Sequence, residues 1–200
     1  NILPIHPMAA FLLKFLAEQA RSNQRSIFEY LKGSADGQEF QEFIVKGGPT
    51  VINAQFLTPD YLWKYFMERS DAGKSREVTE IKLDYDRIVA REFMNYGDDQ
   101  PEIRVLKTVM LFLLLARLMP NGHDRLLPTV ENVELSFRGD GTIMDVGTIV
   151  RDLAENHHCF SVVDGYIELY STTVGGDDLK KKIQELNGSF HDLLHDYCRE

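Results

Sequence analysis

The stretch from Pro101 to Met119 constrains the fold more than any other part of the chain. Pro101 suits the first turn of a helix, and Glu102 suits the positive end of the helix dipole. Every residue from Val109 to Leu115 is apolar. A helix that is apolar on all sides has to be enclosed by other elements. We therefore expect this helix to be the centre of the second half of the chain.

The composition is ordinary for a soluble globular protein, with 44% hydrophobic and 26% charged residues. The net charge of -9 argues against a protein whose main task is to bind nucleic-acid phosphates. The cysteines, Cys159 and Cys198, show no metal-type spacing and form no disulfide framework, so we expect reduced thiols and a cytoplasmic location. Basic residues interrupt the long apolar helix, so we expect no membrane partner.

The first half of the chain is predicted to be helical, with a long loop that contains a short helix at 33–57. Thr58 should cap the third helix, with Pro59 at its first position and Trp63 near its edge. The polar run Gly97–Gln100 then separates a helical, lid-like subdomain, 1–100, from the rest. Apolar residues with helical spacing predict helices at 7–21, 22–32, 58–69 and 78–95.

The second half follows the order of a winged helix, which is three helices and then a β-hairpin. Thr129 should cap the second of these helices. Asp164-Gly165 stands between two β-prone runs, which is the strongest short hairpin signal. We predict a mainly α protein in which residues 101–173 form a winged-helix-like subdomain. Its helices should span 101–119, 129–137 and 142–156, and its hairpin should span 159–170.

Residues 174–200 are predicted to form a C-terminal helix that follows a Gly175-Gly176 hinge. Its apolar residues form a heptad stripe, which fits packing on the body, on a partner, or on the next segment of a longer chain. The stripe consists of Leu179, Ile183, Leu186, Phe190, Leu193 and Tyr197.

No motif predicts catalysis or a metal site within these residues. Gly73-Lys74-Ser75 ends like a Walker A motif, but Glu68 stands where that motif needs its first glycine, so we interpret it as a solvated turn. His191 and His195 lie one helical turn apart without an evident third ligand. Cys159 begins a predicted strand and should be buried, which disfavours a catalytic thiol. We therefore assign no catalytic residue and no metal ligand.

The third helix of a winged helix often enters the DNA major groove. In this chain that helix carries three acidic residues against one arginine, Arg151, and the hairpin tip carries no basic residue. This charge disfavours DNA binding and favours contact with protein.

The opening of the chain resembles a segment of large bacterial P-loop ATPases. The segment covers residues 3–13, Leu-Pro-Ile-His-Pro-Met-Ala-Ala-Phe-Leu-Leu, and residues 22–31, Ser-Asn-Gln-Arg-Ser-Ile-Phe-Glu-Tyr-Leu. It is similar to the helical lid of AAA-like ATPases, including those of BREX-type phage-resistance systems. Gln24 and Glu29 depart from the family pattern, which has Glu and a small polar residue there. Winged-helix-like modules commonly follow this lid in related ATPases.

The resemblance implies a non-catalytic lid and winged-helix fragment of a multidomain ATPase. Its ATP-binding core, with ATP and Mg, would lie upstream of Asn1, so this fragment would hold no cofactor of its own. Arg25 stands where a lid arginine could approach a nucleotide phosphate, and local capping or pairing by Arg25 is the alternative. The partners would be that core and other protein subunits, in phage defence or other nucleic-acid-linked work. The alternative function is a stand-alone acidic winged-helix module that binds protein or regulates transcription.

Overall fold

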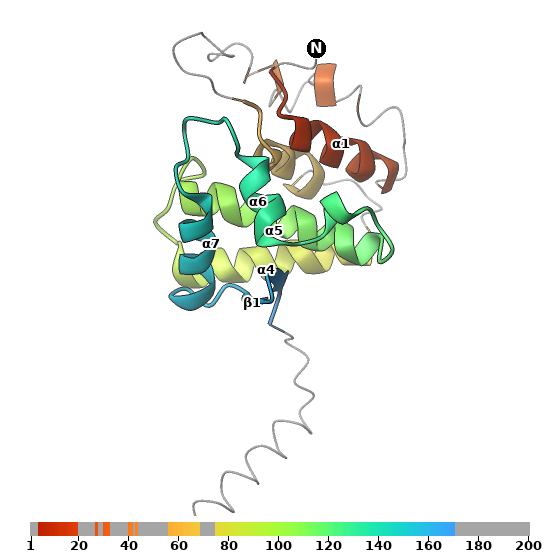
Figure 1. The fold of residues 1–200 in the computed structure, drawn as a ribbon. Coiled ribbons are helices and arrows are strands. Elements are labelled where there is room, and N and C mark those ends of the chain that lie inside the picture. The colour runs from red at the N-terminus through yellow and green to blue at the C-terminus, as the bar shows by residue number, and fades with distance from the viewer. Residues whose placement is uncertain are drawn as a thin grey trace, which may run out of the picture. The chain divides into compact units, whose positions relative to one another are not determined.

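Helix α5, Pro101–Leu118, is the element around which the computed structural model is built (Figure 1). Every residue of α5 from Ile103 to Leu115 is buried, which confirms the prediction of an enclosed central helix. Helices α4 and α7 and the short helix η1 make the most extensive contacts with it. The structure describes residues 4–19, 27, 30–32, 40–41, 43, 56–68 and 75–170.

The prediction of a mainly helical protein with a small antiparallel hairpin is confirmed. Residues Asn1–Glu168 form one compact unit and Leu169–Glu200 a second, and the predicted boundary after residue 100 falls inside the first unit. In chain order the described elements are α1 (Pro7–Gln19), η1 (Pro59–Tyr61), η2 (Lys64–Glu68), α4 (Arg76–Glu92), α5, η3 (Asp124–Leu126), α6 (Val130–Ser136), α7 (Val146–Glu155), β1 (Ser161–Val163) and β2 (Tyr166–Glu168).

The predicted third helix differs from the observed one. It starts as a 3-10 turn, η1, and continues as the π-helix η2. Thr58 stands at the N-cap position but its side chain makes no capping hydrogen bond, because that hydroxyl is used by Arg104 and Asp60. Trp63 is 1% exposed and contacts the ring of Tyr85 on α4 in a tilted arrangement, so its predicted place at the helix edge is wrong.

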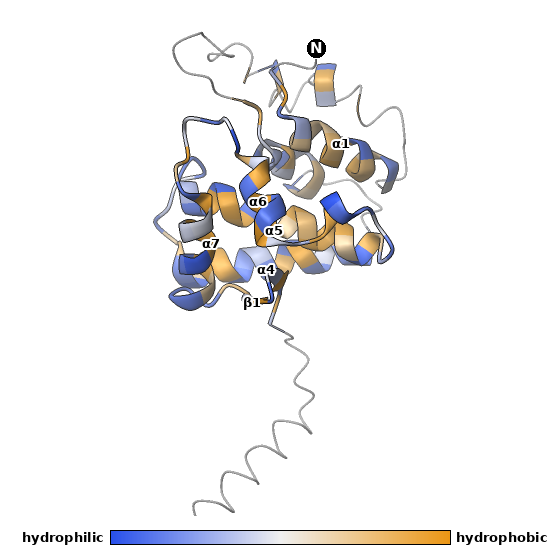
Figure 2. Cartoon of the chain, in the orientation of Figure 1, coloured by the Kyte–Doolittle hydropathy of each residue, from blue (hydrophilic) through white to orange (hydrophobic). Residues whose placement is uncertain are grey.

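Helix α4 begins two residues earlier than its predicted start. Ser75 caps it by accepting the backbone N–H of Val78, so the last residue of the Walker-like turn serves as a helix cap. Buried apolar residues of α4 lie along its length toward α5, and Figure 2 shows the hydrophobic character of α5 itself.

Helix α7 begins at Val146 and not at Thr142, which corrects the prediction. Asp145 caps it from a left-handed backbone conformation and accepts the backbone N–H of Thr148. Thr142 is unavailable as a cap because its hydroxyl contacts Arg104 and Asp140. The apolar residues in and just before α7 that are buried are Ile143, Val146, Val150, Leu153 and Ala154.

The hairpin is confirmed, with β1 and β2 antiparallel and Asp164-Gly165 between them. Both turn residues have positive φ, 51° and 81°, as a two-residue hairpin turn requires. The segment that leads into α6 lies along the other side of β2. There Thr129 forms an isolated bridge with Tyr166, and the Ile167 N–H donates to the carbonyl of Pro128 at 2.7 Å.

Candidate functional site

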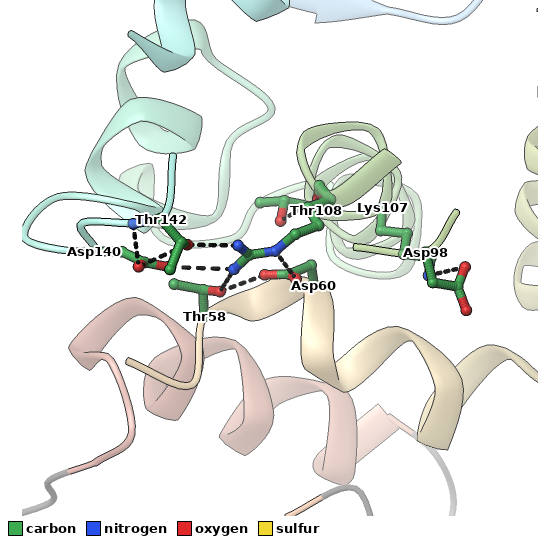
Figure 3. Close-up of polar contacts among 8 residues, drawn as sticks. Thr58, Asp60, Asp98, Lys107, Thr108, Asp140 and Thr142 are labelled. Carbon is green, nitrogen blue, oxygen red and sulfur yellow. Dashed lines mark hydrogen bonds and ion pairs between the residues drawn. The ribbon is translucent and has the colours of Figure 1, made fainter. Parts of the chain in front are cut away.

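A buried polar cluster surrounds Arg104 in the second turn of α5 (Figure 3). The Arg104 Nε–H donates to Asp60 at 2.8 Å, and one Nη2–H donates to the hydroxyl of Thr58 at 2.9 Å. The Thr58 hydroxyl in turn donates to the other carboxylate oxygen of Asp60. The start of η1 is thereby attached to α5 through a closed ring of hydrogen bonds.

The opposite side of the guanidinium contacts the loop between α6 and α7. Arg104 Nη1 donates to the Thr142 hydroxyl at 2.6 Å, and Nη2 lies 3.2 Å from a carboxylate oxygen of Asp140. The other oxygen of Asp140 accepts both the N–H and the hydroxyl of Thr142. One arginine therefore joins three segments that are far apart in the sequence.

The electrostatics of the cluster depend on its burial. Side-chain exposure is 6% for Arg104, 6% for Asp60 and 0% for Asp140. Burial by itself lowers the pKa of Arg104, but the charge of Asp60 and its hydrogen bond outweigh this and raise that pKa. The cluster holds two carboxylates against one cation, and the threonine hydroxyls supply the remaining hydrogen-bond donors.

His6, just before α1, makes a second connection to the same loop. Its Nε2–H donates to the carbonyl of Arg138 at 3.1 Å, while Nδ1 accepts the N–H of Met8 at 3.1 Å. This pattern requires the neutral Nε2–H tautomer. Burial lowers the pKa of His6, although the Arg138 carbonyl and the charge of Asp140 oppose the shift. His6 thus shapes the entry to α1 and does not act as an exposed acid or base.

The Arg104 cluster has the geometry of a structural connector. Its donors and acceptors are satisfied by one another, and its carboxylates are shielded from solvent. Within the described ranges, no group of three or more His, Cys, Asp or Glu side chains could hold a metal ion. Nothing in this geometry supports proton transfer or phosphate binding at Arg104.

The candidate interaction surface is formed by α7 and the hairpin. From Asp145 to Glu168 the chain carries five acidic residues and a single arginine, Arg151. Thr148, Arg151 and Glu155 are exposed along α7, and Figure 2 shows hydrophilic residues over much of this helix. The surface of α7 and the hairpin therefore carries mainly negative charge.

No family model matches this chain. No curated protein and no solved structure matches it either. In the described part of the chain, no helix is long and apolar enough to cross a membrane.

Several residues singled out in the sequence lie outside the described ranges. These are Arg25, the proposed lid arginine, and Lys74 of the Walker-like turn, together with the pair His191 and His195. The structure therefore leaves the role of Arg25 as a prediction. The predicted second helix falls mostly outside the described residues, and the C-terminal helix falls wholly outside them.

Cys159 is 2% exposed, and burial raises the pKa of its thiol to about 12. A thiol with these properties is not a nucleophile at neutral pH, in agreement with the prediction of a buried cysteine. His157 follows α7 and contacts Glu92 at 3.3 Å and the ring of Phe93, so it joins α7 to the end of α4. Arg91 strengthens this junction by donating to the backbone carbonyl of His157.

The Arg104 cluster was missed because its members are distant in the sequence. Arg104 lies 44 residues from Asp60 and 36 residues from Asp140. The available signal was a charged residue on a helix that is otherwise buried. An enclosed arginine requires buried carboxylate partners, even where the sequence does not identify them.

Proposed function

We propose that this chain is a non-catalytic coupling piece of a multidomain P-loop ATPase, in which a winged-helix unit contacts partner proteins. The order α5, α6, α7, β1 and β2 supports the winged helix. The isolated bridge of Thr129 with Tyr166 holds the start of α6 against β2, which is compatible with this arrangement. The observation that carries the protein-binding role is the acidic surface of α7 and the hairpin.

The proposed coupling is supported by the two connections to the loop at 138–142. Arg104 joins η1 to this loop, and His6 joins the start of α1 to it. A change in the position of the N-terminal segment would then reach the start of α7 through groups that are already in contact. If residues 3–13 and 22–31 belong to an ATPase lid, as their resemblance implies, such a change would come from nucleotide binding and hydrolysis in the upstream core.

DNA binding is tested by a gel shift of the full 200-residue chain with mixed-sequence duplex DNA at 50 mM salt. We expect no shift because phosphate neutralisation needs basic residues. A double variant, Glu131→Lys with Glu134→Lys, reverses charge on the exposed face of α6 and serves as a control for assay sensitivity. A salt-dependent shift by the unchanged chain would refute protein binding as the role of this surface.

The ATPase assignment is tested in the intact protein that contains residues 1–200. Arg25→Ala should slow ATP turnover, whereas the nearby Arg21→Ala should not, since Arg21 lies between the two stretches, 3–13 and 22–31, that carry the resemblance. The isolated chain should hydrolyse no ATP. Turnover that survives purification of the isolated chain would contradict the coupling role, and an intact protein without a P-loop core would leave the stand-alone interaction module.

A further inference from the structure

We propose that the outer edge of β1 binds an extended segment of a partner protein that is apolar in its centre and basic at both ends. The segment would add as a further strand beside Ser161–Val163. This inference rests on the proposed protein-binding function of the same surface and specifies where and how the partner docks.

The backbone N–H and C=O groups of Val162 point away from β2. Val163 and Tyr166 flank the two-residue turn, and Val162 lies opposite Ile167. The N–H of Ile167 donates away from β1, to the carbonyl of Pro128. Val162 and Ile167 thus form a non-hydrogen-bonded pair. In an antiparallel ladder, both residues of such a pair direct their N–H and C=O groups away from the opposite strand. The N–H and C=O of Val162 are therefore presented at the free edge, and no described residue pairs with them.

Both faces of this edge expose apolar side chains. Val162 shares its face with Ile167, but it is 38% exposed while Ile167 is 1% exposed. On the opposite face the cross-strand pair Val163 and Tyr166 is 57% and 47% exposed. An added strand would place its side chains beside Val162 on one face and beside Val163 on the other. Its central residues are therefore expected to be apolar or β-branched on both faces.

The charged residues around β1 indicate which side chains the bound segment should carry at its two ends. Glu168 lies opposite Ser161 at one end of β1, and Asp164 follows Val163 at the other, so exposed carboxylates lie near both ends of the edge. Glu155 adds a third exposed carboxylate on α7, which contacts β1. Lysine or arginine at both ends of an added segment would complement this field.

The same charges disfavour a second copy of this chain as the occupant. Antiparallel pairing of two β1 edges would bring Asp164 of one copy close to Glu168 of the other. The net charge of -9 on each chain adds a general repulsion. With only three residues in β1, strand addition offers few backbone hydrogen bonds, so we expect binding that is weak and reversible.

The test uses fluorescence anisotropy with the full chain and a labelled synthetic peptide, Lys-Lys-Val-Thr-Val-Thr-Val-Lys-Lys. Two control peptides keep the central residues: one replaces every lysine with glutamate, and the other carries N-methyl groups on the central amides. We expect the lysine peptide to bind at least tenfold more tightly than either control. Equal binding of all three peptides, or no binding of the lysine peptide, would overturn the inference.

The matched variant is Val162→Pro, which removes an outward N–H without removing a hydrogen bond to β2. It should weaken binding of the lysine peptide at least fivefold, while Leu83→Thr, at a 49% exposed apolar site on α4, should not. Unchanged affinity in Val162→Pro would overturn the proposed edge. If that variant does not fold, the N-methyl peptide decides the question alone, because it removes the backbone donors from the other side.

Other occupants give distinct results. A dimer of the unchanged chain that disappears in Val162→Pro would assign the edge to a second copy and refute the partner inference. A salt-dependent gel shift with DNA refutes the proposed function. A negative gel shift together with absent peptide binding refutes only the assignment of the partner segment to β1.

Discussion

Replacing Arg104 with methionine should destabilise the protein strongly. Methionine fills a similar volume, but it leaves the carboxylates of Asp60 and Asp140 buried without their shared cation. Removing one member of a buried ion pair typically costs about 3–5 kcal/mol, because the remaining charge stays desolvated. With a urea m-value of about 2 kcal/mol per M, the unfolding midpoint should fall by about 2 M.

Urea unfolding followed by tryptophan emission measures this loss. Trp63 is the single tryptophan of the chain and is 1% exposed beside Tyr85, so its emission reports on how the segment between η1 and η2 packs against α4. The matched control is Arg76→Met, which removes an arginine whose side chain is 86% exposed in its pair with Glu80. That change should leave the midpoint where it is, since exposed pairs contribute little.

A double-mutant cycle separates the ion pair from the loss of packing. Asp140→Asn alone should also destabilise, but Arg104→Met with Asp140→Asn should lose less than the two single changes together. Direct partners typically show a coupling of about 0.5–3 kcal/mol. A loss below about 1 kcal/mol for Arg104→Met, or strict additivity in the cycle, would refute the cluster as the main connector of these segments.

Three further predictions follow from individual side chains. Because burial lowers the pKa of His6, its contribution to stability is present above about pH 6.5 and is lost as the pH falls through the folded-state pKa. His6→Gln should therefore flatten the dependence of the urea midpoint on pH below about 6.5. In a Cys198→Ser background, Cys159, with its pKa raised to about 12, should react with a thiol reagent at pH 8 only after urea unfolding, and rapid labelling of the folded protein would contradict its burial. Thr129→Ala removes the cap that accepts the Asn132 N–H and should cost about 1 kcal/mol in the same unfolding assay, whereas a loss near zero would show that the cap is not needed.

The sequence was most informative where a feature depends on neighbouring residues. The enclosed helix α5, the Thr129 cap and the Asp164-Gly165 turn each follow from a few adjacent residues, and all three are present. Their bounds are accurate to within two residues in α5 and α6, where the caps are local.

The predicted helix starts were wrong where the hydroxyl of the expected first residue hydrogen-bonds to a residue far away in the sequence. Thr58 was expected to cap a helix and Thr142 to begin one, yet their hydroxyls contact Arg104 from positions 46 and 38 residues away. With Thr142 unavailable, α7 starts later and is capped by Asp145. A local pattern cannot reveal that a hydroxyl has a better partner elsewhere, so these starts required the tertiary structure.

The loop at 138–142 lies between the N-terminal segment, which is proposed to move with nucleotide state, and the surface of α7 and the hairpin, which is proposed to bind a partner. His6 contacts the Arg138 carbonyl at one end of this loop, and Arg104 contacts Asp140 and Thr142 toward the other end. The next residues lead directly into the Asp145 cap of α7, whose far end connects to β1. Displacing the N-terminal segment therefore requires breaking buried contacts or moving the loop with it. Because breaking a buried ion pair is costly, we expect the loop and the start of α7 to follow the segment, so that Arg104 transmits the movement as well as stabilising the fold.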